Sequence, residues 1–139
     1  MKERLLLVDD EDDILDFLER VFRKEYILYR ASSGKEALEI IQREPIDILI
    51  TDQKMPEMTG LELLAEMRKV LADYDRIIKI LLSGYADVPE IVKAVEEYRI
   101  HQYMVKPINS TRLRKAVDEA KKRRNSDDWT LTTGTDPEF

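Results

Sequence analysis

The chain has 139 residues, a formal net charge of −6, one histidine and no cysteine, so it is long enough for one domain but cannot form a disulfide framework, a Cys-ligated zinc site or a multi-histidine metal site. Its four glycines lie too far apart for a phosphate-binding P-loop or a dinucleotide turn, and no segment has the pattern of a membrane span or a secretory signal. We therefore expect a cytoplasmic domain, without a membrane partner, whose chemistry depends on oxygen ligands.

Short apolar runs alternate along the chain with segments whose apolar residues recur every three or four positions. The runs predict strands at 5–8, 27–31, 46–51, 77–82 and 102–105. The segments between and after them predict helices whose apolar stripes cover 14–22, 37–41, 61–71, 91–95 and 113–120. Nearly continuous apolar runs are typical of strands buried on both faces. The pattern therefore predicts an α/β fold, a doubly wound (βα)5 unit with a five-stranded parallel sheet.

Capping signals mark the starts of four of these helices. They are Ser33 with Glu36, Thr59 with Glu62, Asp87 with Glu90, and Asn109 or Ser110.

The sequence contains two clusters of like charge, one acidic and one basic. Seven acidic residues lie within 9–19, and most of them suit the positive end of a helix dipole. The basic run at 112–124 could indicate nucleic-acid binding, but its charges flank a regular apolar stripe and no aromatic residue interleaves them. We therefore interpret the basic run as the exposed face of a helix and expect no direct nucleic-acid binding.

Polar side chains follow four of the five predicted strands. They are Asp9 and Asp10, then Asp52, then Ser83, and last Lys106. In a parallel sheet these positions meet at one edge, where such folds bind ligands. Three carboxylates held together require a counter-charge, and Mg²⁺ is the natural ion for oxygen ligands. A lysine and a hydroxyl beside them would suit phosphoryl transfer to a carboxylate.

The sequence resembles the receiver domains of two-component response regulators. The resemblance rests on the segments 5–13, 48–64, 81–87 and 103–108, and the run from Asp52 to Gly60 is its most specific part. It implies a receiver domain over 1–124, with a flavodoxin-like sheet in the strand order 2-1-3-4-5. The segment 125–139 is predicted to be a disordered tail or linker, and 134–139 has the composition of residues left from cloning.

The resemblance also implies a role for each polar group. Asp52 matches the phosphoacceptor, which takes its phosphoryl group from a sensor histidine kinase or a phosphotransfer protein. Asp10 would bind Mg²⁺ directly and Asp9 through water. Asp52 and the backbone carbonyl of Lys54 would complete the protein ligands of the ion. Lys106 would contact the phosphoryl group.

A conformational switch is implied as well. Ser83 would move towards the phosphoryl group, Tyr103 would swing inward with it, and Pro107 would follow a cis peptide bond. The surface of 87–124 would then contact an output domain or effector, or form a phosphorylation-dependent homodimer. We expect that surface to include Tyr98, Ile100, His101 and Tyr103. Ordinary half-buried packing is the alternative for the two tyrosines, and His101 is expected to be structural.

The resulting hypothesis is a signalling module that catalyses only its own phosphorylation and slow dephosphorylation. An aspartate-based phosphohydrolase of the haloacid-dehalogenase type would need an acid where Lys54 stands, and a flavodoxin-like electron carrier would need a glycine- and hydroxyl-rich loop where Asp9 and Asp10 stand. A degenerate receiver is disfavoured because every acceptor-site group is present. Lys54 and Tyr85 occupy positions that tune the lifetime of the aspartyl phosphate in this family.

Overall fold

The computed structural model describes residues 1–124, so the predicted tail at 125–139 lies outside the described residues. Within residues 1–124, five parallel strands form one sheet in the order β2-β1-β3-β4-β5, which confirms the predicted topology. The strands are β1 (Arg4–Val8), β2 (Ile27–Ala31), β3 (Ile48–Asp52), β4 (Ile78–Ser83) and β5 (Gln102–Val105).

Two strands extend one residue further than the apolar pattern predicts. Asp52 pairs with Leu82 and Ser83 pairs with Val105, so both polar residues are the last members of their strands rather than the first loop residues. Backbone pairing with a neighbouring strand sets the end of each strand, and a run of apolar letters does not record it.

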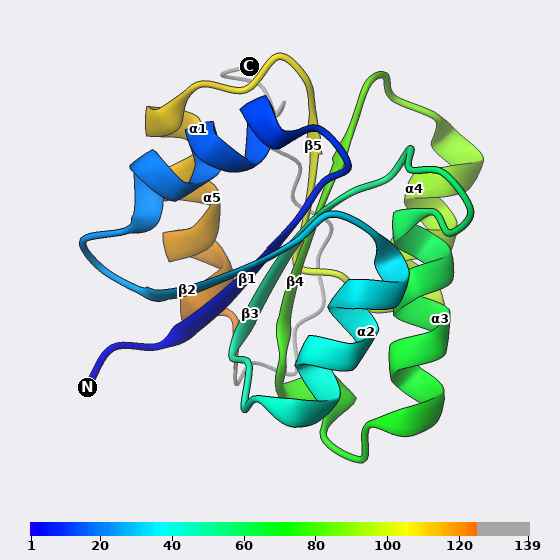
Figure 1. Ribbon diagram of the computed structural model, residues 1–139. Helices are drawn as coiled ribbons and strands as arrows, with labels where there is room; N and C mark the ends of the chain where they lie inside the picture. The colour runs from blue at the N-terminus through cyan, green and yellow to red at the C-terminus, as the bar shows by residue number, and fades with distance from the viewer. Residues whose placement is uncertain (125–139) are drawn as a thin grey trace.

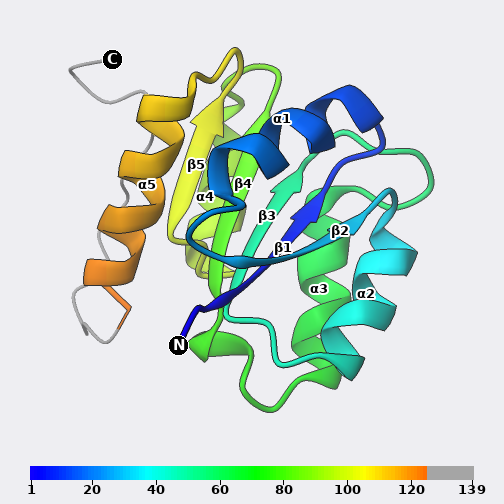
Figure 2. The same ribbon diagram turned by 60° about the vertical axis from the view of Figure 1, so that its left-hand side comes forward.

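Helices cover both faces of the sheet, as Figures 1 and 2 show. One face carries α1 (Asp12–Phe22) and α5 (Ser110–Lys122), and the other carries α2 (Gly34–Arg43), α3 (Gly60–Val70) and α4 (Val88–Glu96). A short 3-10 helix, η1 (Tyr74–Arg76), precedes β4. Among residues 1–124, no helix combines the length and the apolar composition that a membrane crossing requires.

The predicted caps are present, with one change of partner. Thr59 and Glu62 form the complete reciprocal box at the start of α3. Ser33 accepts the backbone N–H of Glu36, but the Glu36 carboxylate accepts from the backbone N–H of Ser32 instead of that of Ser33. The starts of α4 and α5 are capped by the side chains of Asp87 and Asn109, so Asn109 rather than Ser110 is the cap of α5.

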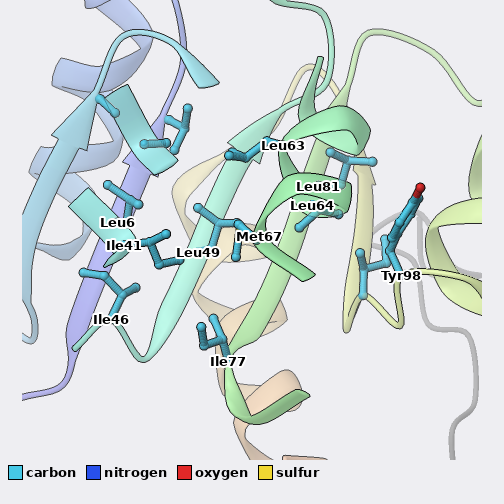
Figure 3. Packing of buried hydrophobic residues seen from close by; sticks show 14 of the residues in the cluster. Leu6, Ile41, Ile46, Leu49, Leu63, Leu64, Met67, Ile77, Leu81 and Tyr98 are labelled. Atoms are coloured by element: carbon cyan, nitrogen blue, oxygen red, sulfur yellow. The ribbon is translucent and has the colours of Figure 1, made fainter. Parts of the chain in front are cut away.

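Two apolar cores lie on opposite sides of the sheet, and β3 contributes to both. Leu49 packs with α2 and α3, as Figure 3 shows, while its neighbours Ile48 and Ile50 pack with α1 and α5. Successive side chains of a strand point to opposite faces, so a strand with layers on both sides has no solvent-facing position. All five residues of β3 are accordingly buried.

A buried polar cluster lies at the amino ends of β4 and β5. Lys79 is only 1% exposed, and its ammonium donates to the Tyr74 carbonyl at 3.0 Å and lies 4.2 Å from the centre of the Tyr74 ring. Burial lowers the pKa of Lys79 from 10.5 to about 7. His101 accepts the backbone N–H of Lys79 through Nδ1, and burial lowers its pKa to about 3. His101 therefore lies in the core, as expected for a structural histidine.

Ion pairs connect the start of β1 with the end of α5. Glu3 pairs with Lys121 at 3.2 Å and with Arg124 at 2.7 Å. These contacts hold the beginning of β1 against the end of α5.

Candidate functional site

Parallel pairing brings the predicted polar residues to one edge of the sheet. In the sheet, β2 lies on one side of β1 and β3 lies on the other, so the strand order reverses between β1 and β3. Asp9 follows β1 and Asp52 ends β3 at this crevice, which is where open α/β sheets bind ligands. Ser83 ends β4, and the backbone N–H of Lys106 donates to the Ser83 carbonyl at 2.8 Å. The site is thus assembled from four neighbouring strands.

Three carboxylates converge at the crevice. Asp9, Asp10 and Asp52 each offer an oxygen within 4.8 Å of the others. Asp9 and Asp52 are buried, whereas Asp10 is exposed. This arrangement keeps two acids fixed in the fold and leaves the third open to solvent.

The environment of Asp9 disfavours its charge. Burial raises the pKa of Asp9 to about 6, and the negative charges of Asp52 and Asp10 act in the same direction. The backbone N–H of Glu11 donates to Asp9 Oδ1 at 2.9 Å, and this hydrogen bond and the Lys106 charge oppose the rise. Asp9 Oδ2 is buried and has no hydrogen bond among the described residues. The oxygen is therefore open to an additional positive partner.

Lys106 bridges the buried acids. Its Nζ lies 2.7 Å from Asp52 Oδ1 and 3.8 Å from Asp9 Oδ2. Burial alone would lower the pKa of Lys106, but the hydrogen bond and charge of Asp52 outweigh it, so the pKa is raised. Lys106 is consequently a fixed cation at neutral pH. The peptide bond from Lys106 to Pro107 is cis, which confirms that prediction.

A cavity of about 340 Å³ opens beside Asp52. Lys54, Ser83, Tyr85 and Lys106 are among the residues that line it. The Ser83 hydroxyl donates to the Tyr85 carbonyl at 3.0 Å, so it is engaged with the loop before α4. A group that entered the cavity would have to compete for this hydroxyl.

The side chains expected on the output surface are buried instead. Tyr98, Ile100, His101 and Tyr103 are 8, 3, 3 and 0% exposed, so the prediction that they form an exposed face is wrong, as is half-buried packing for the two tyrosines. Tyr98, Ile100 and Tyr103 pack into the core that α2, α3 and α4 cover, and the Tyr74 hydroxyl of η1 donates to the Tyr98 carbonyl. The exposed apolar side chains of this region are those of Tyr85, Val88 and Val92.

Several residues that line the cavity were not predicted as site residues, Gln53 and Glu90 among them. Glu90, predicted only as a capping partner, lines the cavity and accepts the Tyr103 hydroxyl at 2.6 Å, and Gln53 lines the cavity and donates to Glu90 at 3.3 Å. Gln53 directly follows Asp52, so its place in the sequence could have indicated that it lies close to the cavity. The position of Glu90 depends on how α4 is placed, and no local pattern records that placement.

The donor set suits a hard divalent cation. Carboxylate oxygens are the ligands that Mg²⁺ prefers, and it commonly keeps several waters. Asp9 supplies an orphaned buried oxygen, Asp10 an exposed one and Asp52 the third. A dication here would relieve the mutual repulsion of the three acids, while the open side towards Asp10 leaves room for water or phosphate oxygens.

Comparison with known proteins points to one family. The family model "Response regulator receiver domain" matches residues 5–118. The chain is 38% identical over 103 residues to the hydrogenase transcriptional regulatory protein HoxA of Cupriavidus necator, and 33% identical over 118 residues to sporulation initiation phosphotransferase F of Bacillus subtilis. These alignments cover 74% and 84% of this chain, and 21% and 92% of the two relatives.

Solved structures agree with the sequence relatives. The signal receiver domain of an HD domain-containing protein from Pseudomonas fluorescens Pf-5 superposes with a TM-score of 0.81 at 30% identity, and the match covers 91% of this chain and 100% of that one. A CheY-like receiver domain protein from Methanospirillum hungatei gives 0.82 at 27% identity, covering 92% and 100%. The chain spans 21% of HoxA and 26% of the Escherichia coli regulator GlrR.

Proposed function

The chain belongs to the response regulator receiver domain family of two-component signalling, and on that premise we propose that it is a phosphorylation-dependent switch whose acceptor is Asp52. The observation that carries the proposal is the pairing of buried Asp52 with Lys106 at 2.7 Å beside an open cavity. The pairing holds the carboxylate in place, and the cavity gives a phosphoryl donor access.

The transfer follows from the positions of these groups. An Oδ atom of Asp52 attacks the phosphorus of a phosphohistidine, so an O–P bond forms while the P–N bond breaks. The departing imidazole nitrogen keeps the electron pair and takes up a proton. Lys106 lies where its charge offsets the negative charge of the incoming phosphoryl oxygens, and Ser83 can donate to one of them after leaving the Tyr85 carbonyl.

A metal ion completes the charge balance in this proposal. Asp10 would bind Mg²⁺ directly, Asp9 through water, and Asp52 and the backbone carbonyl of Lys54 would supply the remaining protein oxygens. The bound ion supplies positive charge that offsets the negative charge of the transferring group. The orphaned Asp9 Oδ2 and the 4.8 Å cluster support this assignment.

The partners follow from the family. The donor would be a sensor histidine kinase or a phosphotransfer protein in the cytoplasm. The surface of residues 87–124 would contact an output domain or effector, or a second copy of the chain, through side chains that are exposed in this conformation, such as Val88 and Val92.

Intact-mass measurement tests the acceptor assignment. Incubation with acetyl phosphate and Mg²⁺ should add the mass of one phosphoryl group to the protein, and Asp52→Asn should abolish the addition. Asp13→Asn, which makes the same change at an exposed position of α1, should react like the wild type. A phosphoryl group on Asp52→Asn would refute the assignment.

A further inference from the structure

A chain of hydrogen bonds at the cavity includes Gln53 and Glu90 and ties α4 to neighbouring elements. The Gln53 side chain donates through Nε2 to Glu90 Oε2 at 3.3 Å and accepts the backbone N–H of Leu61 through Oε1 at 2.8 Å. The Tyr103 hydroxyl donates to Glu90 Oε1 at 2.6 Å. Each oxygen of the Glu90 carboxylate is thus held by a different element, one by the segment after β3 and one by β5.

Glu90 is also a fourth carboxylate at the cavity. It lines the same space as Asp52 and Ser83, and it lies in the first turn of α4, where Asp87 caps the helix. The two groups that hold it, a hydroxyl and an amide, are neutral. The charge of Glu90 is therefore not offset by these partners, and it is sensitive to other charges in the cavity.

The position of Tyr103 makes this carboxylate important. The ring of Tyr103 is 0% exposed and lies inside the fold in this conformation, with its hydroxyl held by Glu90. Its hydroxyl and that of Ser83 also meet at one acceptor, since the Tyr85 carbonyl lies 3.3 Å and 3.0 Å from them. Any movement of Ser83 or Tyr103 towards a phosphorylated Asp52 would therefore also affect the contact between Tyr103 and Glu90.

We propose that Glu90 is the group through which α4 responds to phosphorylation, because its hydrogen bonds to Gln53 and Tyr103 hold the helix and repulsion from a phosphorylated Asp52 weakens them. The proposal rests on the function proposed above. Phosphorylation replaces a carboxylate of charge −1 by a group that carries about −1.5 to −2. Lys106 and a bound Mg²⁺ would offset part of the added charge, and the remainder enters the space that Glu90 also lines, where like charges repel. Glu90 then withdraws, and the first turn of α4 is released.

The test separates the charge of Glu90 from its size. Glu90→Gln keeps an oxygen acceptor for Tyr103 but carries no charge, and Glu96→Gln makes the same change at an exposed position of the same helix. Each protein is treated with acetyl phosphate and Mg²⁺, its phosphoryl content is measured by intact mass, and hydrogen exchange of residues 88–96 is compared at matched phosphoryl content.

We expect phosphorylation to speed exchange in the first turns of α4 roughly tenfold in the wild type and in Glu96→Gln, and less than about twofold in Glu90→Gln. Tyr103→Phe, which removes the hydroxyl but leaves the charge, should show fast exchange of α4 before phosphorylation. An unchanged response in Glu90→Gln, or slow exchange in unphosphorylated Tyr103→Phe, would overturn the role of Glu90 while leaving Asp52 as the acceptor. A wild type that gains no phosphoryl group would refute the proposed function itself, and the mass spectrum distinguishes the two failures.

Discussion

Asp10 is the one acid of the cluster that faces solvent, and this sets the expected effect of its removal. Asp9 and Asp52 are buried and lie beside the Lys106 ammonium, whereas Asp10 offers a carboxylate oxygen that solvent can reach. Asp10→Ala should weaken Mg²⁺ binding by at least about 10–100-fold, which is the range typical of losing an outer-shell partner of a metal ligand. Calorimetric titration with Mg²⁺ measures the effect, with Asp13→Asn as the control. An unchanged Mg²⁺ affinity would remove Asp10 from the metal site.

Lys79 gives the protein a stability that depends on pH in the alkaline range. The folded chain releases the Lys79 proton near pH 7, whereas the unfolded chain holds it up to the ordinary pKa of 10.5. The unfolded state therefore binds more protons between these values, so the free energy of unfolding rises with pH across this window and is lowest below it. Of the other strongly shifted groups, Asp9 and His101 titrate below the window. Burial raises the pKa of Tyr74 and Tyr103, so these groups affect stability only near and above pH 10, where the unfolded tyrosines begin to lose their protons.

Between pH 7.5 and 9.5, the free energy of unfolding of the wild type should increase by about 2 kcal/mol. Lys79→Met keeps the length of the buried side chain and removes its charge, so its stability should be nearly independent of pH over that range. Denaturant unfolding at a series of pH values measures both proteins. If the slope persists in Lys79→Met, other groups are responsible for it.

At the scale of the elements, the connection from β3 to α3 packs closely against the end of β3 at Gly60. A Cβ on Gly60 would lie 2.6 Å from the Asp52 carbonyl oxygen and 2.7 Å from Leu81 Cδ1. The first contact is with backbone, which cannot move aside cheaply. Gly60 thus allows α3 to start directly against the strand that carries Asp52.

Gly60→Ala should lower the free energy of unfolding by about 1–3 kcal/mol, the usual cost of overpacking. Gly84→Ala is a matched control, because a Cβ there would meet no atom within 4 Å, and its stability should stay within about 0.5 kcal/mol of the wild type. Thermal or denaturant unfolding of the two variants provides the comparison. Equal stabilities would mean that the start of α3 shifts freely.

The elements were predictable from sequence to different degrees. Alternating apolar periods and caps such as Thr59 with Glu62 are local, so they identified five strands, five helices and the sheet edge with Asp9, Asp52, Ser83 and Lys106. Contacts between distant elements were not predictable in this way. The hydrogen bond of Lys79 with His101 joins residues 22 positions apart, and the contact of Glu90 with Gln53 joins residues 37 positions apart.

At the scale of the whole molecule, β3 links the two cores. Leu49 belongs to the core under α2 and α3, and Ile50 belongs to the core under α1 and α5. Both side chains are 0% exposed. Because adjacent residues of one strand pack into both cores, we expect the two layers to unfold together.

Leu49→Ala and Ile50→Ala should each cost about 2–5 kcal/mol, as expected for large-to-small changes in a packed core. Both variants should unfold in a single transition with the denaturant dependence of the wild type. Chemical unfolding followed by two probes, circular dichroism and tyrosine fluorescence, tests this. Separate transitions for the two probes in either variant would show that the layers are independent.

The ion pairs of Glu3 with Lys121 and Arg124 have a consequence for the connectivity of the chain. They bring the beginning of β1 and the end of α5 together, so a short peptide can join the two and leave the sheet undisturbed. New ends can then be opened at the exposed residues Ala72 and Asp73, between α3 and β4. Such a circular permutant keeps every strand beside its present neighbours. The order in which the chain visits the five strands is therefore separable from the architecture that assembles Asp9, Asp52, Ser83 and Lys106.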